Sequence, residues 1–181
     1  MIALGCVTGR FQPVHTQHLE LFAIALAECD HLIVAITNPD AGARREEAAS
    51  THRHTAAANP FTYFERVRLI DAAVDERGWR GRVTTVPFDL AAPVHWPNYA
   101  PRSARQFVRA YSEWERQKAA RFEAAGYAVT LLEGDTQGRI SAGEIRARIG
   151  AGEPGWQQQV PAATVPLLDA MNAQRPLAER T

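Results

Sequence analysis

The sequence has little of several features that mark other classes of protein. Its 181 residues include two cysteines, one lysine, no apolar run of 18 residues, and 20 acidic side chains that balance 20 basic ones. This balance argues against a broad surface for nucleic acid or anionic lipid. The missing apolar run argues against a membrane-spanning helix. Cys6 and Cys29 have neither metal-binding nor redox spacing, so we expect a reduced, cytoplasmic chain.

Two common phosphate-binding motifs are missing as well. No GxxxxGK[ST] sequence occurs, and Lys118 is the only lysine, which excludes a P-loop enzyme. The dinucleotide-binding pattern GxGxxG is also absent. The first apolar stretch has no basic segment before it, which is not typical of a secretion signal.

Strands and helices are expected to alternate along the chain. Apolar runs over 2–8 and 31–37, separated by helical periodicity over about 16–28, predict a strand–helix–strand unit with parallel strands. Two more strands are expected over 82–88 and 126–134, and helices are expected from Asn59 as N-cap, as one or two over 102–125, over 140–149 and over about 162–171. The pattern predicts a single α/β domain over 1–181 with a Rossmann-like, doubly wound parallel sheet. Its core is expected over 2–165, with a frayed tail over about 174–181.

One long segment, over about 39–58, has no periodicity. It is expected to be a mobile loop, and it carries Arg44, Arg45, His52, Arg53 and His54. Two interpretations stay open for it: a solvated surface loop, or a lid that closes over a compact anionic acceptor.

The first strand is followed by a segment suited to anion binding, GRFQPVHTQH, which ends at His18. Gly9 allows a close turn, Arg10 can face an anion, and His15 lies on the same side of the helix start as His18. A helix N-terminus favours phosphate through its free amides and its dipole, and imidazole donors would add to this. A capping turn with exposed histidines is the structural alternative. A zinc pair is a further alternative, but no third ligand lies nearby in the sequence.

A second helix start follows the strand at 126–134. Ser141 is the expected N-cap, and Glu144 would complete a capping box. Capping does not account for Arg139 and Arg146, which bracket the same helix start. Two guanidinium groups in that position suit a polyphosphate tail.

Together these segments resemble the HxGH-type nucleotidyltransferases, in particular the archaeal-type nicotinamide mononucleotide (NMN) adenylyltransferases. GRFQPVHTQH is similar to the family's GRFQPxHxGH, NPFTYFER to its NPFTxxER, and ISAGEIR to its ISxTxIR. The resemblance covers about 2–165. It implies that an acceptor phosphate oxygen attacks the α-phosphorus of a nucleoside triphosphate and that pyrophosphate leaves.

The resemblance also implies roles for individual residues. His15, His18 and Arg10 would be catalytic, at the transfer centre. The nucleotide site would include Gly9, Phe11, Gln12, Ser141, Arg146 and Arg139, and the acceptor site Asn38, Phe61, Arg66, Trp96, Arg44 and Arg45. Mg²⁺ would bind with the triphosphate and water, because the motifs offer no protein cage. A homo-oligomer is expected from the same family.

Three departures from the family pattern bear on the substrates. Gln17 replaces a glycine, Gly143 replaces a threonine, and the segment 111–115 replaces a YxGNP-like sequence. We therefore favour a CTP-dependent cytidylyltransferase for a small phosphonate, similar to the phosphonoformate enzymes of antibiotic biosynthesis. An NMN adenylyltransferase is the alternative. In that case Trp96 would stack on nicotinamide, although it could simply pack in its proline-rich loop. A catalytically silent nucleotide sensor on the same fold is the third reading.

Overall fold

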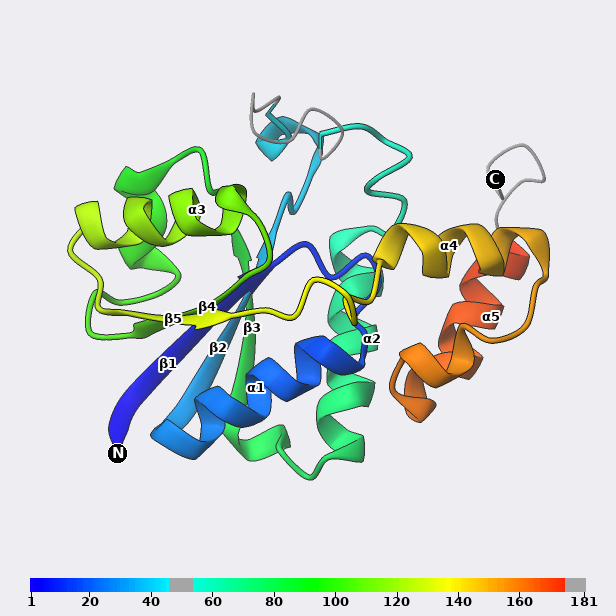
Figure 1. The fold of residues 1–181 in the computed structure, drawn as a ribbon, viewed down its shortest axis with the longest axis horizontal. Coiled ribbons are helices and arrows are strands. Elements are labelled where there is room, and N and C mark those ends of the chain that lie inside the picture. Colours follow the sequence, from blue (N-terminus) through cyan, green and yellow to red (C-terminus); the bar gives the residue numbers. More distant parts are fainter. Residues whose placement is uncertain (46–53, 175–181) are drawn as a thin grey trace.

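A computed structural model describes residues 1–45 and 54–174, and within these ranges five parallel strands form one sheet (Figure 1). The strands are β1 (Ile2–Gly9), β2 (Cys29–Thr37), β3 (Val83–Phe88), β4 (Arg105–Ala110) and β5 (Val129–Glu133). The helices are α1 (Thr16–Glu28), α2 (Tyr63–Glu76), α3 (Glu113–Ala124), α4 (Ala142–Ala151) and α5 (Val165–Gln174). The strand order β3-β2-β1-β4-β5 confirms the predicted Rossmann-like fold.

Each face of the sheet has its own apolar core. Along β1, Val7 packs into the core under α1 and α2, whereas its neighbour Cys6 packs into the core on the α3 side. On β2, Leu32 and Ile33 divide between the two cores in the same way. Successive strand side chains point to opposite faces, so a strand covered on both sides is apolar almost throughout. This explains why the first two strands could be located from their apolar runs.

The prediction of helix throughout 102–125 was wrong, because the segment forms β4 and then α3. β4 lies between β1 and β5 and pairs in parallel with both. Phe107 and Val108, which are adjacent in sequence, are both about 1% exposed and lie in different cores. A short apolar run of this kind is equally compatible with a buried helix segment, so periodicity does not distinguish the two.

The start of α2 also differs from the prediction. Its N-cap is Thr62 and not Asn59. The Thr62 hydroxyl accepts a hydrogen bond from the Glu65 amide at 3.2 Å, and the Glu65 carboxylate accepts one from the Thr62 amide at 2.7 Å. This reciprocal capping box fixes the helix start three residues later than expected. The side-chain amide of Asn59 instead donates to the Thr55 carbonyl.

The strand order determines where this sheet can bind a ligand. The chain adds β2 and β3 on one side of β1 and β4 and β5 on the other, so β1 and β4 flank the point where the order reverses. Such a point leaves a crevice beyond the carboxyl ends of the strands. His52 and Arg53 of the predicted loop, and 175–181 of the predicted tail, lie outside the described residues. Among the residues that the structure does describe, no helix has the length and apolar character needed to cross a bilayer.

Candidate active site

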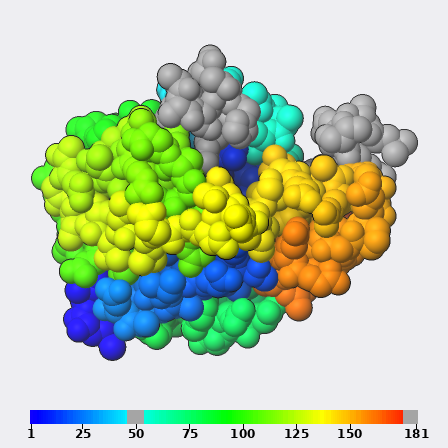
Figure 2. Space-filling model, viewed as in Figure 1, coloured from blue at the N-terminus to red at the C-terminus, as the bar shows by residue number. Residues whose placement is uncertain are grey.

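A cavity of about 560 Å³ opens beyond the ends of β1 and β4. In Figure 2, blue atoms of the N-terminal segment are visible in a hollow beside the yellow segment that precedes α4. Among the described residues that line the cavity there is one acidic side chain, Glu115, and the basic ones are Arg10, Arg109, Lys118, Arg139 and Arg146. Because the lining has five cationic groups and one carboxylate, the cavity suits a highly anionic ligand.

His15 and His18 come together at the start of α1, as predicted. His15 is the N-cap, and its ring stacks on that of His18 with centroids 3.6 Å apart. The main-chain N–H of His15 donates to Nδ1 of His18 at 3.1 Å. A neutral imidazole that accepts at Nδ1 carries its proton on Nε2, so we assign Nε2 as the donor of His18. Nδ1 of His15 is buried and has no hydrogen-bond partner within the described chain.

Both histidines are held neutral. Burial, with a smaller contribution from the positive charges of Arg139 and Arg109, lowers the pKa of His15 to about 3. The pKa of His18 is lowered well below its ordinary value by burial and then by His15 and the nearby cations. Neutral imidazoles each keep one N–H and have little tendency to take up a second proton, so the pair is suited to donate hydrogen bonds to a phosphate and is a poor base.

The turn between β1 and α1 is held by close packing. A Cβ on Gly9 would lie 2.8 Å from the ring of Phe11, so this position requires glycine. The Phe11 ring contacts the His18 ring edge-on, with centroids 4.9 Å apart. The Gln12 side chain accepts from the Phe61 amide at 2.9 Å and donates to the Phe61 carbonyl at 3.0 Å. Gly9, Phe11 and Gln12 all line the cavity, and Gln12 also joins the turn to the segment before α2.

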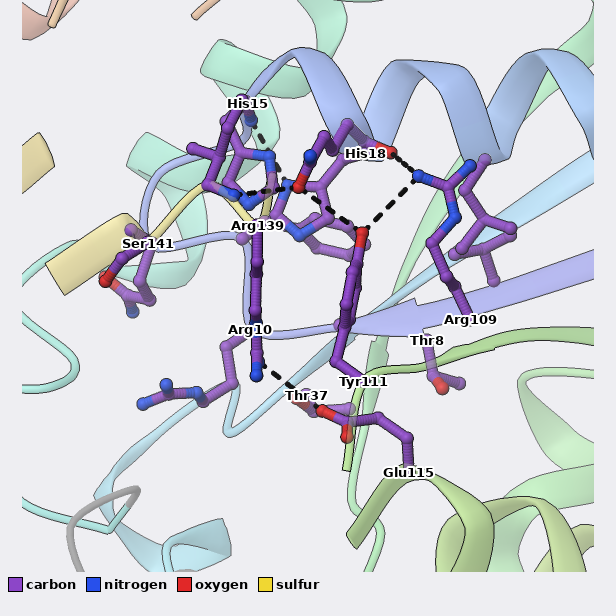
Figure 3. A pocket seen from close by; sticks show the side chains of 18 of the residues that line it. Thr8, Arg10, His15, His18, Thr37, Arg109, Tyr111, Glu115, Arg139 and Ser141 are labelled. Atoms are coloured by element: carbon purple, nitrogen blue, oxygen red, sulfur yellow. Dashed lines mark hydrogen bonds and ion pairs between the residues drawn. The ribbon is translucent and has the colours of Figure 1, made fainter. Parts of the chain in front are cut away.

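The second predicted helix start reaches the same cavity. Ser141 caps α4 by accepting from the Glu144 amide at 3.3 Å. Arg146 donates to the main-chain carbonyl of Gln12 at 2.6 Å, so the two signatures are in direct contact. Arg139 lies 4.7 Å from the centroid of the Tyr111 ring and pairs with Glu115 at 3.6 Å, as Figure 3 shows. The residues predicted for the nucleotide site therefore converge.

Gln17, which stands where the family has glycine, connects the two helix starts. Its side chain donates to the Gly138 carbonyl at 2.7 Å and accepts from the Ile140 amide at 2.9 Å. The Tyr111 hydroxyl donates to the same side-chain oxygen at 3.3 Å. The side chain thus bonds to the loop before α4 rather than projecting into the cavity unpartnered.

Two residues predicted for the acceptor site lie outside the cavity lining and make structural contacts. Arg66 is about 1% exposed, and its guanidinium donates to the carbonyls of Arg10, Thr37 and Asn38 at 2.9, 2.7 and 2.8 Å. It therefore holds together the main chain after β1 and after β2. The Phe61 side chain is 3% exposed and belongs to the apolar core.

Trp96 is also not at this cavity. Its ring is about 1% exposed and stacks on Phe88 at 5.6 Å, and its indole N–H donates to the Asp89 carbonyl at 2.8 Å. It reaches only the wall of a smaller cavity, of about 430 Å³, between residues 39–43 and 87–99. A ring that is about 1% exposed and stacks on Phe88 has little surface left for a ligand, which favours the packing interpretation.

The remaining acceptor candidates are not among the residues that line the cavity. Asn38 donates from its side chain to Asn59 at 3.4 Å, and its main chain has a φ of 51°. Arg44 donates to the Asn59 carbonyl at 3.5 Å, whereas Arg45 is exposed and bonds to main-chain oxygens of its own loop. Arg10 lines the cavity and donates to the Ala58 carbonyl at 3.1 Å.

Sequence reasoning missed the residues that β4 and α3 contribute. Arg109, at the end of β4, donates to the Glu20 carboxylate at 3.0 Å and to the Gln17 carbonyl at 3.4 Å. Glu115 and Lys118 line the cavity from α3. Lys118 carried a signal that could have been used, because it is the one lysine in a chain with 20 basic residues.

The described residues do not offer a protein cage for a metal. No cluster of three or more histidine, cysteine, aspartate or glutamate side chains in these ranges could hold one. Glu115, the acidic group of the cavity, already accepts from the Ser112 hydroxyl at 2.5 Å and pairs with Arg139. This donor set fits a divalent ion that is bound by a triphosphate and water, and does not fit a resident metal.

Comparison with known proteins gives one family. The family model described as cytidylyltransferase-like matches residues 6–148. A phosphonoformate cytidylyltransferase from Streptomyces viridochromogenes is 37% identical over 160 residues, which cover 88% of this chain and 86% of that protein. A nicotinamide-nucleotide adenylyltransferase from Pyrococcus abyssi is 31% identical over 162 residues, which cover 89% of this chain and 80% of that one.

Solved structures agree on the fold. A bifunctional NMN adenylyltransferase/ADP ribose pyrophosphatase from Francisella tularensis matches with a TM-score of 0.67 and 16% identity over 97% of this chain and 51% of that one. Its structure with AMP and a manganese ion matches with a TM-score of 0.66 and 17% identity over 97% of this chain and 50% of that one. The chain thus spans about half the length of that bifunctional protein, and the match concerns the fold alone.

Proposed function

The chain belongs to the cytidylyltransferase-like family, and from this premise we propose that it transfers CMP from CTP to a small phosphonate. Its family and its named relatives make it a nucleotidyltransferase. The observation that supports the proposed acceptor best is the cavity, where five basic side chains surround the neutral pair His15 and His18. A small acceptor with several negative charges suits such a lining.

The proposed reaction needs no covalent intermediate. A phosphonate oxygen attacks the α-phosphorus of CTP, the bond from that phosphorus to the bridging oxygen breaks, and pyrophosphate leaves. His18 would donate from Nε2 to the oxygens of the α-phosphate, where negative charge increases in the transition state. Arg139, Arg146 and the start of α4 would hold the leaving phosphates. The protein's contribution is positioning and charge stabilisation.

Mg²⁺ would enter this site with the triphosphate. When bound, it neutralises phosphate charge and assists departure of pyrophosphate. The cavity suits this arrangement, because its acidic side chain is held by Ser112 and Arg139.

A second candidate is transfer of AMP from ATP to NMN. The 31% identity to the Pyrococcus abyssi enzyme and the GRFQP sequence favour it. The packed position of Trp96 argues against stacking of its ring on nicotinamide, which this candidate would include.

An assay of pyrophosphate release distinguishes these functions. CTP, ATP, GTP and UTP are each combined with phosphonoformate, methylphosphonate or NMN in the presence of Mg²⁺. The proposal predicts release with CTP and phosphonoformate. Release with ATP and NMN alone would support the second candidate. If no combination releases pyrophosphate while calorimetry shows that a nucleotide binds, the chain is a nucleotide sensor.

A further inference from the structure

The inner end of the cavity holds a polar corner for which the proposed transfer chemistry has no role. Lys118, on α3, is about 8% exposed, and its Nζ lies 3.3 Å from the main-chain carbonyl of Thr8, near the end of β1. Thr8 is about 7% exposed, and its buried hydroxyl has no hydrogen-bond partner in the described chain. Both residues line the cavity. Figure 3 shows Thr8 and Glu115 at the end of the cavity away from His15.

A buried hydroxyl without a partner loses its hydration and gains nothing in return, so its position indicates a ligand group. The lysine beside it points to the charge of that group. Arginine occupies 19 of the 20 basic positions in this chain, and this corner has the single lysine. An ammonium is a compact point charge with three donors, which fits a small corner better than a planar guanidinium fork.

The other members of the corner keep it positive. The Glu115 carboxylate accepts from the Ser112 hydroxyl and pairs with Arg139, so its charge is shared with that arginine. The Trp114 ring lies 5.4 Å from Nζ of Lys118, which is within the range of a cation–π contact. An ammonium held between an indole and the end of a strand has few alternative positions. It is therefore preorganised for an anion.

We propose that Lys118 and Thr8 bind a second anionic group of the acceptor, a carboxylate whose carbon is bonded directly to the phosphonate phosphorus. This inference rests on the proposed function, because it names the part of the acceptor that the transfer centre does not bind. Thr8 directly precedes Gly9, and Arg10 follows in the same turn that leads to the histidines. An acceptor held at Thr8 by one group would extend its phosphonate along this turn toward the triphosphate. The chain would therefore select phosphonates that carry a carboxylate over phosphonates that lack one.

The test compares two acceptors, phosphonoformate and methylphosphonate, in wild type and in Lys118→Met. Methionine keeps the length of the side chain and removes its charge. We expect the ratio of kcat/KM for phosphonoformate to that for methylphosphonate to fall about tenfold or more, as for loss of a charge-assisted contact. The KM for CTP should stay within about twofold. Arg116→Met is the matched control on α3, since Arg116 is exposed and pairs with Glu133, and it should leave the ratio unchanged.

Thr8→Val keeps the inference testable if Lys118→Met does not fold. Valine has the shape of threonine, and the hydroxyl that it removes makes no hydrogen bond in the described chain. The same ratio should fall several-fold with an unchanged thermal midpoint. If kcat/KM falls equally for both acceptors, or if the KM for CTP rises, the inference is wrong and the proposed function is unaffected. Wild type that turns over ATP and NMN but not phosphonoformate would overturn both.

Discussion

The rings of His15 and His18 stack 3.6 Å apart, and the main-chain N–H of His15 fixes the tautomer of His18 through its Nδ1. The pair is thereby prepared before a ligand arrives, with a donor on His18 and an unpartnered nitrogen on His15. Preorganised donors need no rearrangement as charge develops, and this is the largest source of stabilisation in many active sites.

Replacing His18 with alanine should therefore affect turnover more than binding. The change removes the Nε2 donor and leaves the arginines of the cavity in place. We expect kcat to fall about 10²- to 10³-fold, the effect of losing one such donor, with a much smaller change in the KM for CTP. Steady-state kinetics on a variant whose circular dichroism matches wild type provides the check. A variant that loses nucleotide affinity but keeps its turnover rate would contradict a role in the transition state.

The pKa of His15 predicts how stability depends on pH. The imidazole has a pKa of about 3 in the folded chain and of about 6.5 when unfolded. Between these values the unfolded chain binds more protons, so this group's contribution to the free energy of unfolding falls as the pH falls below about 6.5. Urea unfolding of wild type and His15→Asn measures it. The stability of wild type relative to the variant should fall by about 1–2 kcal/mol between pH 7.5 and about pH 5. A difference that stays constant with pH would contradict the assignment.

Gln17→Gly restores the glycine of the family pattern and tests the connection between the two helix starts. The change removes the hydrogen bonds to Gly138, Ile140 and Tyr111. We expect a loss of about 1–2 kcal/mol in the free energy of unfolding and a KM for CTP raised several-fold, because the loop before α4 is less well held. Gln17→Glu retains the acceptor for the Ile140 amide and is the matched comparison. Unchanged kinetics in both variants would show that the loop does not depend on this side chain.

Gly143→Thr tests the second departure from the family pattern. An added Cβ would lie 3.5 Å from the Ser141 hydroxyl and 3.8 Å from the Arg146 guanidinium, which are ordinary contacts. Threonine is also a better helix former than glycine, by a few tenths of a kcal/mol. We expect a variant at least as stable as wild type, with a lower KM for CTP from the added hydroxyl. A drop in the thermal midpoint would show that the space is smaller than the geometry indicates.

Arg66→Met should reveal a structural role for this arginine. The variant leaves the buried carbonyls of Arg10, Thr37 and Asn38 without their donor. We expect a loss of about 3 kcal/mol in the free energy of unfolding, as for breaking a buried hydrogen-bond network. Urea denaturation measures this loss. A variant with wild-type stability and a raised KM for the acceptor alone would restore the predicted acceptor role.

The local elements near the signatures were predictable from the sequence, since their signals are local. The helix from Thr16 to Glu28 matches its prediction, and the strand before it ends one residue later than expected. The N-cap at Ser141 was located from the same kind of signal. These features depend on periodicity and capping, which a single sequence carries.

The partners of buried polar groups were not predictable, because they depend on tertiary contacts. Arg66 and Trp96 have residue types typical of a binding site, yet the fold buries one against main-chain carbonyls and the other against Phe88. The missed strand β4 had a further consequence. With 102–125 assigned to helix, Lys118 could not be placed at the end of β1, 110 residues away in sequence.

The most direct test of the account is pyrophosphate release from CTP and phosphonoformate with Mg²⁺, measured on wild type and on His18→Ala. We expect steady release by wild type and a rate about 10²- to 10³-fold lower in the variant. Wild type that binds CTP and releases no pyrophosphate with phosphonoformate, or a His18→Ala variant that is equally fast, would contradict it.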